Sequence, residues 1–457
     1  LTVMTFLGAG MLSGISAQVS PLQVDTLKET KIPDQWDLQS CIDYAKEQNI
    51  TIRKNRITAA STQIDVKTAK AALFPSLSFS TGHQVVNRPY QETSSRVSGS
   101  EIISSNSKTS YNGNYGLNAS WTLYNGNKRL KTIQQEKLNN QMAELDVATS
   151  ENNIQESIAQ VYIQILYAAE SVKVNENTLQ VSIAQRDRGQ ELLNAGSIAK
   201  SDLAQLEAQV STDRYQLVTA QATLEDYKLQ LKQLLELDGE NEMNIYLPAL
   251  SDENVLAPLP TKRDVYISAL SFRPEIEASK LNVEASELGI NIAKSSYFPT
   301  ISLSAGIGTN HTSGSDFTFG EQVKNGWNNS IGLSVSVPIF NNRQTKSAVQ
   351  KAKLQYETSM LSLLDEQKAL YKTIESLWLD ANSAQQRYAA ANEKLKSTQI
   401  SYELISEQFN LGMKNTVELL TEKNNLLQAQ QEQLQAKYMA ILNTQLLKFY
   451  QGDQLAL

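Results

Sequence analysis

Two stretches of the sequence switch from a helical to a strand-like pattern of apolar residues at the same point. Residues 69–80 read AKAALFPSLSFS, and residues 293–304 read AKSSYFPTISLS. Each stretch opens with a helical periodicity, meets Phe-Pro, and continues as a strict alternation of apolar and polar positions. Proline cannot extend a helix, and it pushes the preceding residue toward extended backbone. We therefore predict helix-to-strand joints at Pro75 and Pro299.

The alternating pattern predicts four strands, at 75–84, 115–124, 299–309 and 328–340. Strands of about ten residues suit a tilted membrane strand, with lipid on one face and water on the other. A half-buried sheet in a soluble protein would show the same alternation, so the strands alone leave both interpretations open. Residues 87–114 are rich in Ser, Thr, Asn and Gly and are interpreted as a long loop.

Four strands are too few to close a barrel over a pore, and a bilayer tolerates no free sheet edge. If these strands span lipid, several chains must share one barrel. Eight strands would give a barrel filled by side chains, whereas twelve strands from three chains would leave room for a water channel.

Long helical patterns follow each pair of strands. Residues 128–193 and 343–409 lead to short breaks, and further helices are predicted at 200–237 and 415–450. In the helix predicted at 200–237, apolar residues recur every seven positions, at Leu203, Val210, Leu217, Leu224 and Leu231. This heptad predicts a coiled coil, although Asp213 interrupts the complementary apolar line. An amphipathic helix on a globular core is less favoured, because no core-forming partner sequence lies nearby.

The same order of elements occurs twice, which indicates an internal two-fold repeat. Gly116 and Gly332 are 216 residues apart, and so are Gly196 and Gly412. The predicted organisation is a signal-peptide remnant at 1–17, an N-terminal lead at 18–36, a first repeat at 37–237, an inter-repeat linker at 238–262, a second repeat at 263–450 and a C-terminal tail at 451–457. The apolar and small residues of the first segment predict export.

Composition narrows the classes of function. A balance of 48 acidic against 41 basic residues argues against nucleic acid as a partner. The single cysteine, Cys41, excludes an intrachain disulfide and a thiolate metal cluster. The two histidines, His83 and His311, are interpreted as polar strand residues. No GxSxG, HExxH or P-loop motif occurs, so we expect neither an enzyme nor a bound metal or cofactor.

Two matching motifs carry a resemblance to a known family. Residues 191–209 read ELLNAGSIAKSDLAQLEAQ, and residues 407–425 read EQFNLGMKNTVELLTEKNN. In each, a glycine is followed six residues later by an acid and an apolar pair. Together with the duplicated plan and the Phe-Pro joints, these motifs resemble the TolC family of bacterial outer-membrane efflux channels. The resemblance covers about residues 37–450.

The resemblance implies a mixed α and β fold and a homotrimer. Three chains would share a twelve-stranded outer-membrane β-barrel, four strands from each, continuous with a long periplasmic α-helical coiled-coil barrel. The implied function is the outer-membrane exit duct of a tripartite efflux or type I secretion system. Such a duct lies in outer-membrane lipid and receives substrates from a periplasmic adaptor and an inner-membrane pump. The alternative is a periplasmic or peripheral coiled-coil interaction protein without a channel, which needs neither strands nor a signal.

The resemblance also implies a periplasmic gate at the two helix–helix tip turns, Gly196 and Gly412. In the family, a cation at the position of Lys414 and an acid at the position of Asp202 contribute to the links that close the tip. Glu418 is predicted to supply a single carboxylate ring.

Two positions depart from the family pattern. Phe409 lacks the hydroxyl that the family's aromatic residue contributes to the closing links. Thr421 stands where the best-known member carries a second acid, so the double carboxylate ring that cations can block in that member is not expected here. Ordinary solvated helix charge is the alternative interpretation of the charged residues at the tip.

Overall fold

The structure is a computed structural model that describes residues 33–90, 94–98, 101–105, 108–238, 243–248, 255–313 and 317–455. The predicted signal-peptide remnant, most of the N-terminal lead, parts of the linker and the last two residues of the tail lie outside the described residues. The chain divides into two compact units. Among the described residues, unit 1 comprises 33–57, 147–273 and 368–455, and unit 2 comprises 58–146 and 274–367.

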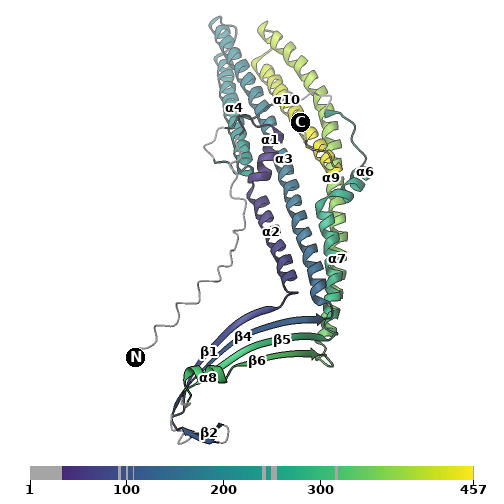
Figure 1. Cartoon of the computed structure of the whole chain (residues 1–457). Coiled ribbons are helices and arrows are strands. Elements are labelled where there is room, and N and C mark those ends of the chain that lie inside the picture. The colour runs from purple at the N-terminus through teal and green to yellow at the C-terminus, as the bar shows by residue number, and fades with distance from the viewer. Residues whose placement is uncertain are drawn as a thin grey trace. The chain divides into compact units, whose positions relative to one another are not determined.

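Unit 2 contains an antiparallel sheet of four strands (Figure 1). The strands lie in the order β1 (Ser76–Asn87), β4 (Thr109–Asn125), β5 (Thr300–Thr312) and β6 (Asn328–Ser336). Each repeat supplies two neighbouring strands, and the ladder between β4 and β5 joins the repeats. Phe79 lies opposite Leu117, which in turn lies opposite Ile307. The register therefore places alternate residues of all four strands on one face.

The two faces of this sheet differ in polarity. One face carries large apolar side chains that stay exposed in the single chain, namely Leu77, Phe79, Leu117, Trp121, Ile307, Ile331, Leu333 and Val335. The opposite face carries small and polar residues, among them Ser78, Ser80, Gly116, Asn118, Ser304, Gly306, Ser330 and Gly332. A continuous exposed apolar surface of this kind marks a face that contacts lipid or protein.

The two helix-to-strand joints have the same construction. Helix α2 (Ile50–Ala71) leads into β1, and helix α7 (Pro274–Ser295) leads into β5. The N–H of the residue before each proline donates to the carbonyl three residues back, at 3.0 Å in the first repeat and 3.1 Å in the second. Pro75 and Pro299 follow, and each strand begins one residue later. Because proline has no N–H, the helical hydrogen bonding stops there, and the residues that follow pair in the sheet.

The prediction of a loop at 87–114 is wrong. β1 and β4 continue to pair as far as Asn87 opposite Thr109. Beyond them, β2 (Ser94–Ser98) pairs with β3 (Glu101–Ser105). A ladder is made by backbone groups alone, so a run of Ser, Thr and Asn can extend a hairpin even though its composition resembles that of a loop.

Two smaller differences occur in the second repeat. The sequence did not predict helix α8 (Phe319–Asn325), because seven residues are too few to show a helical periodicity. A capping box fixes its start: Thr318 N–H donates to Glu321 Oε2 at 2.8 Å, and Glu321 N–H donates to Thr318 Oγ1 at 3.4 Å. Strand β6 ends before residue 340, since Pro338 offers no N–H to a ladder.

Unit 1 is mainly helical. It contains α1 (Leu38–Gln48), α4 (Lys200–Leu234), α6 (Lys262–Phe272) and α10 (Thr416–Gln451), with parts of α2, α3 (Lys128–Asn194) and α9 (Gln344–Asn410). Helices α3 and α4 form one hairpin, and α9 and α10 form another (Figure 1). Helix α10 contacts both α4 and α6. None of the helices in the described parts of the chain is both long and apolar enough to cross a membrane.

Trp36, at the end of the predicted N-terminal lead, is hydrogen-bonded to the linker. Its N–H donates to the Asn244 carbonyl at 2.8 Å, and Tyr246 N–H donates to the Trp36 carbonyl at 2.8 Å. The Tyr162 hydroxyl of α3 donates to the Tyr246 carbonyl at 2.6 Å, which ties the linker to the core of unit 1. Cys41 of α1 is fully buried, and burial raises the pKa of its thiol to about 12, so it is an unreactive core residue.

Gly126 connects β4 to α3 with φ at +66°. A Cβ at this position would lie 2.6 Å from the Ser295 carbonyl oxygen and 2.9 Å from Phe298 Cβ. We predict that Gly126→Ala lowers the melting temperature of the detergent-purified protein, measured by circular dichroism. Left-handed backbone costs a non-glycine residue about 1–2 kcal/mol, and the new methyl group overlaps the second joint. Gly82→Ala is the matched control, since a Cβ at Gly82 meets nothing within 4 Å. Equal melting temperatures for the two variants would contradict this role of Gly126.

Candidate functional site

The two helix–helix turns of unit 1 are built from the same motif. At the first turn, Gly196 N–H donates to the Leu193 carbonyl at 2.9 Å, and Ser197 N–H donates to the Leu192 carbonyl at 2.8 Å. This pair of bonds is a Schellman motif, which requires left-handed backbone at the glycine. Gly196 has φ at +74°, and Gly412 repeats both the motif and the backbone angle, at +76°. The glycines therefore mark the tips because L-residues with a Cβ rarely adopt this conformation.

The acid six residues after each glycine has a local structural role. Glu418 is the third residue of α10: its N–H donates to Asn415 Oδ1 at 2.9 Å, and Asn415 N–H donates to Glu418 Oε2 at 3.1 Å. Asp202 occupies the same place in α4 and accepts from Ala199 N–H at 3.0 Å. Because alanine has no side-chain acceptor, the first repeat has only half of this capping box. The fixed spacing in the sequence motif thus reflects a turn followed at once by a helix cap.

Lys414 lies beside the second cap. Its Nζ donates to Glu418 Oε1 at 2.6 Å, an ion pair within a single turn of chain. This bond and the bond from Asn415 hold the pKa of the Glu418 carboxyl below its usual value. Among the predicted gate residues, the structure brings Lys414 and Glu418 together and places Asp202 on the other hairpin, bonded to its own helix start. Phe409 is buried.

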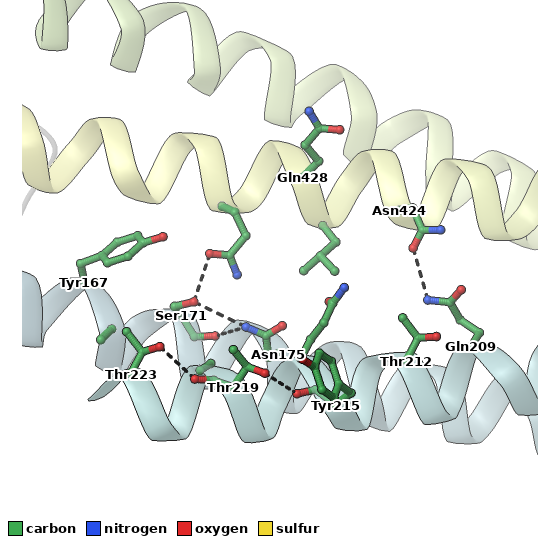
Figure 2. Close-up of a pocket in the computed structure, with 15 residues that line it drawn as sticks. Tyr167, Ser171, Asn175, Gln209, Thr212, Tyr215, Thr219, Thr223, Asn424 and Gln428 are labelled. Carbon is green, nitrogen blue, oxygen red and sulfur yellow. Dashed lines mark hydrogen bonds between the residues drawn. The ribbon is translucent and has the colours of Figure 1, made fainter. Parts of the chain in front are cut away.

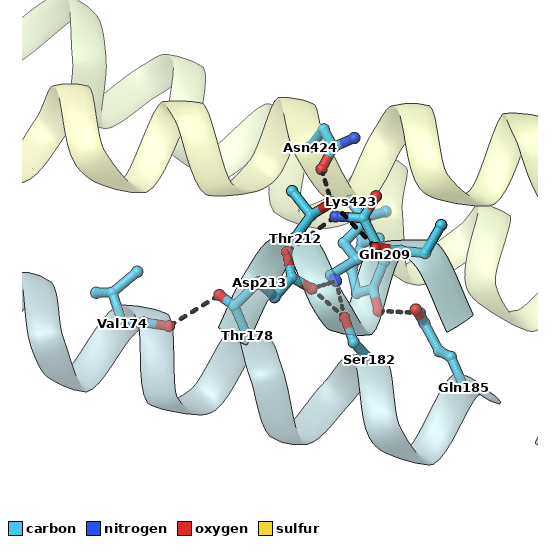
Figure 3. Close-up of polar contacts among 11 residues, drawn as sticks. Val174, Thr178, Ser182, Gln185, Gln209, Thr212, Asp213, Lys423 and Asn424 are labelled. Carbon is cyan, nitrogen blue, oxygen red and sulfur yellow. Dashed lines mark hydrogen bonds and ion pairs between the residues drawn. The ribbon is translucent and has the colours of Figure 1, made fainter. Parts of the chain in front are cut away.

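Farther from the tips, a buried polar cluster joins the two hairpins. Lys423 of α10 donates to Asp213 of α4 and to Ser182 of α3, and Ser182 also donates to Asp213 (Figure 3). The three residues are 3%, 1% and 2% exposed, respectively. A single lysine therefore links α10 to both helices of the first hairpin.

Every charge in this cluster is compensated. Asp213 Oδ2 accepts hydrogen bonds from Lys423 Nζ and Ser182 Oγ. Asp213 Oδ1 accepts a hydrogen bond from Gln209 Nε2 at 2.9 Å. Burial lowers the pKa of Lys423, while the hydrogen bond and the charge of Asp213 oppose that shift. A buried ion pair of this kind adds little stability compared with apolar residues of similar volume. If the two hairpins aligned in a different register, however, each charge would be buried without its partner, which is strongly destabilising. The cluster therefore specifies how the two hairpins align.

The sequence indicated one of the two charged residues of this cluster. Asp213 stood out as an acid within an apolar heptad line, and a buried acid requires a buried cation. Nothing in the local pattern distinguished Lys423 from the other lysines of the chain, because its partner lies on the other repeat. In the described residues, no group of three or more His, Cys, Asp or Glu side chains is arranged to hold a metal ion.

Beside the cluster, an open groove of about 670 Å³ runs between the hairpins (Figure 2). The side chains that line it belong to α3, α4 and α10 and carry no formal charge; among them are Tyr167, Asn175, Thr212, Tyr215, Leu427 and Gln428. Two hydrogen bonds join the hairpins here, from Gln209 Nε2 to Asn424 Oδ1 at 3.3 Å and from Ser171 Oγ to Gln431 Oε1 at 3.1 Å. Neutral hydrogen bonds contribute only about 0.5–1.5 kcal/mol each, since water replaces them readily. The polar contacts across the groove are therefore weaker than the buried ion pair beside it.

We predict that Lys423→Met destabilises the protein by about 3–5 kcal/mol, because Asp213 would remain buried without its cation. The double variant Lys423→Met with Asp213→Leu should recover most of the loss. The control is Lys394→Met, which removes an exposed pair with Glu432 and should cost about 0–1 kcal/mol. Urea unfolding followed by circular dichroism measures all three. A loss for Lys423→Met no larger than that for Lys394→Met would contradict the assignment.

Comparison with known proteins gives consistent matches. The family profile described as outer membrane efflux protein matches residues 41–236 and 265–452. The outer membrane efflux protein BepC of Brucella suis is 24% identical over 294 residues, which are 64% of this chain and 61% of BepC. The outer membrane protein TolC of Escherichia coli is 24% identical over 294 residues, which are 62% of this chain and 58% of TolC. The chain thus matches about three-fifths of the length of each relative.

A crystal structure of CusC shares the fold, with a TM-score of 0.76 at 19% identity, over 91% of this chain and 92% of that chain. These matches confirm the predicted family resemblance and the mixed α and β fold. A family of outer-membrane efflux proteins also agrees with the predicted location and with the prediction that the chain is not an enzyme. Because the family profile covers most of both repeats, the chain belongs to the outer membrane efflux protein family.

Proposed function

We propose that the chain is one subunit of a homotrimeric outer-membrane exit duct that conducts substrates passively out of the periplasm. The observation that carries this proposal is the sheet of unit 2, which has an exposed apolar face and a polar face. Its outer strands, β1 and β6, each have one edge without a partner within the described sheet. Free backbone groups at such an edge are costly in lipid, so strands from other chains must pair with them.

Three copies would close a barrel of twelve strands if β6 of each chain pairs with β1 of the next. The apolar faces would then contact lipid, and the Ser, Asn and Gly faces would line a water channel. The hairpins of unit 1 would form the periplasmic part of the duct. A periplasmic adaptor and an inner-membrane pump are the proposed partners, by membership in the family of efflux proteins.

The proposed gate has two layers. At the tips, Lys414, Glu418 and Asp202 carry partly exposed charges, and ion pairs near the surface contribute only about 0–1 kcal/mol each, which suits contacts that open and close. Farther along the hairpins, the buried pair of Lys423 and Asp213 keeps each subunit's two hairpins in register. In this proposal the tips separate between subunits, while the buried cluster stays intact within each subunit.

Conductance in a planar lipid bilayer tests the proposed function. We predict that the detergent-purified protein inserts and gives stable, stepwise channel currents. Failure to insert, combined with solubility in the absence of detergent, would overturn the duct. A coiled-coil interaction protein whose strands form a soluble sheet would then be the function that remains.

We predict that Lys414→Ala and Asp202→Ala each raise the resting conductance of the channel, because each removes a charge that the proposed closing links between subunits require. Lys394→Ala, on an exposed pair away from the tips, is the control and should leave conductance unchanged.

Lowering the pH should also raise the resting conductance. The pKa of Glu418 lies below its ordinary value of 4.5, so its ionised contacts stabilise the tip above about pH 4.5 and are lost as the pH falls through the lowered pKa. Glu418→Gln keeps the helix cap but not the charge, and its conductance should not respond to this acid step. Unchanged conductance in both alanine variants would remove these residues from the gate.

A further inference from the structure

The four strands of the sheet in unit 2 carry no Asp, Glu, Lys or Arg on either face, although 19% of the whole chain is charged. Charges resume directly beyond the strands, at Arg88 and Lys108 past one end and at Lys128 and Arg129 past the other. The two histidines of the chain belong to the apolar face, where their ring centroids lie 6.4 Å apart across β4. The polar face of the sheet therefore consists of neutral side chains alone.

Contact with lipid explains the lack of charge on only one of the two faces. An Arg or Lys on the lipid face of a membrane strand destabilises the protein by about 2–4 kcal/mol at the bilayer midplane, so the apolar face must exclude charge. A face that lines water carries no such penalty, and substitutions there change selectivity instead. The neutrality of the polar face is thus a property of the passage that this face would line.

The polar side chains of this face are bonded to one another along the wall. The hydroxyl oxygens of Ser76 and Ser120 lie 2.8 Å apart, and Asn118 Nδ2 donates to Ser80 Oγ at 3.4 Å. A Cβ added to Gly306 would lie 3.2 Å from Asn118 Oδ1, so the amide lies over the glycine of the next strand. Polar groups that already have partners in the wall hold a passing solute weakly, as conduction requires.

The residues of the polar face are also small. Two adjacent lines cross all four strands: Ser80, Gly116, Gly308 and Asn328 form one, and Ser78, Asn118, Gly306 and Ser330 form the other. Neither line contains a side chain larger than asparagine. In a closed barrel such lines become rings that neither narrow the passage nor place a fixed charge beside a solute.

We propose that the polar faces of β1, β4, β5 and β6 form an uncharged sleeve, which passes hydrophilic cargo that is cationic, anionic or neutral without selecting it by charge. This inference rests on the proposed duct, because only there does the polar face line water. A fixed charge acts on a solute over about one Debye length, about 8 Å at physiological ionic strength. Selection by charge is then left to other parts of the chain, such as the tips of unit 1 with Asp202, Lys414 and Glu418.

The test measures the electrostatic potential at the wall with two thiol reagents of opposite charge, a cationic and an anionic methanethiosulfonate. It uses the full chain reconstituted in lipid vesicles. Ser80→Cys and Ser304→Cys each place a thiol at an exposed position of the polar face, and the native Cys41 is fully buried. We expect both new thiols to react, with a ratio of cationic to anionic rate within about threefold of that of a free thiol in solution. A larger departure in either direction would overturn the proposal.

A single added charge provides the matched comparison. Ser120 is paired opposite Ser304, so Ser120→Asp places a carboxylate beside the thiol of the Ser304→Cys chain. We expect this change to move the rate ratio more than about threefold in favour of the cationic reagent, because opposite charges attract at this separation even in water. Ser120→Asn has nearly the same size without the charge and should leave the ratio unchanged. If Ser120→Asp has no effect, charge on this face does not act on solutes, which would equally overturn the proposal.

A thiol on the opposite face separates this inference from the proposed function. Leu333→Cys lies on the apolar face, which contacts lipid in the proposed duct, and should react with neither reagent. If Leu333→Cys reacts, or if the polar-face thiols do not, the faces are wrongly assigned and the proposed duct fails whatever the ratio. If only the polar-face thiols react, the duct stands, and the rate ratio alone decides whether the sleeve is uncharged.

Discussion

The ladder between β4 and β5 is the interaction on which unit 2 depends, because it is where two homologous halves of the chain become one sheet. Its register aligns Leu117 with Ile307, and the flanking ladders carry the same alternation to β1 and β6. A shift of one residue would turn every side chain to the opposite face. The apolar face, the polar face and the approach of the two histidines all follow from this one register.

In unit 1, the corresponding constraint is the cost of a buried charge. Asp213 and Lys423 lie on helices from different repeats, and each is tolerated in the interior only because the other is present. The neutral groove beside them is held by hydrogen bonds that water can replace. The buried ion pair keeps the two hairpins in register, while the hydrogen bonds across the groove can be replaced by hydrogen bonds to water.

Features set by neighbouring residues were predictable from the sequence. The Schellman turns at Gly196 and Gly412, the acids that cap the following helices and the prolines at the joints act over a few residues, so their spacing in the chain already carries their geometry. The strand extensions within 87–114 and helix α8 were missed for the opposite reason. Polar strands are held by backbone pairing, and a short capped helix shows no periodicity.

The sequence by itself therefore determined the local elements, their duplicated order, the polarity of each strand and the family to which these motifs are similar. Only the tertiary structure decided which distant residues meet. Lys423 finds Asp213 across two hairpins, and His83 finds His311 across an intervening strand. The physical reason is that periodicity and capping are short-range effects of the backbone, whereas the partner of a charge or a ring depends on how elements far apart in the chain pack together.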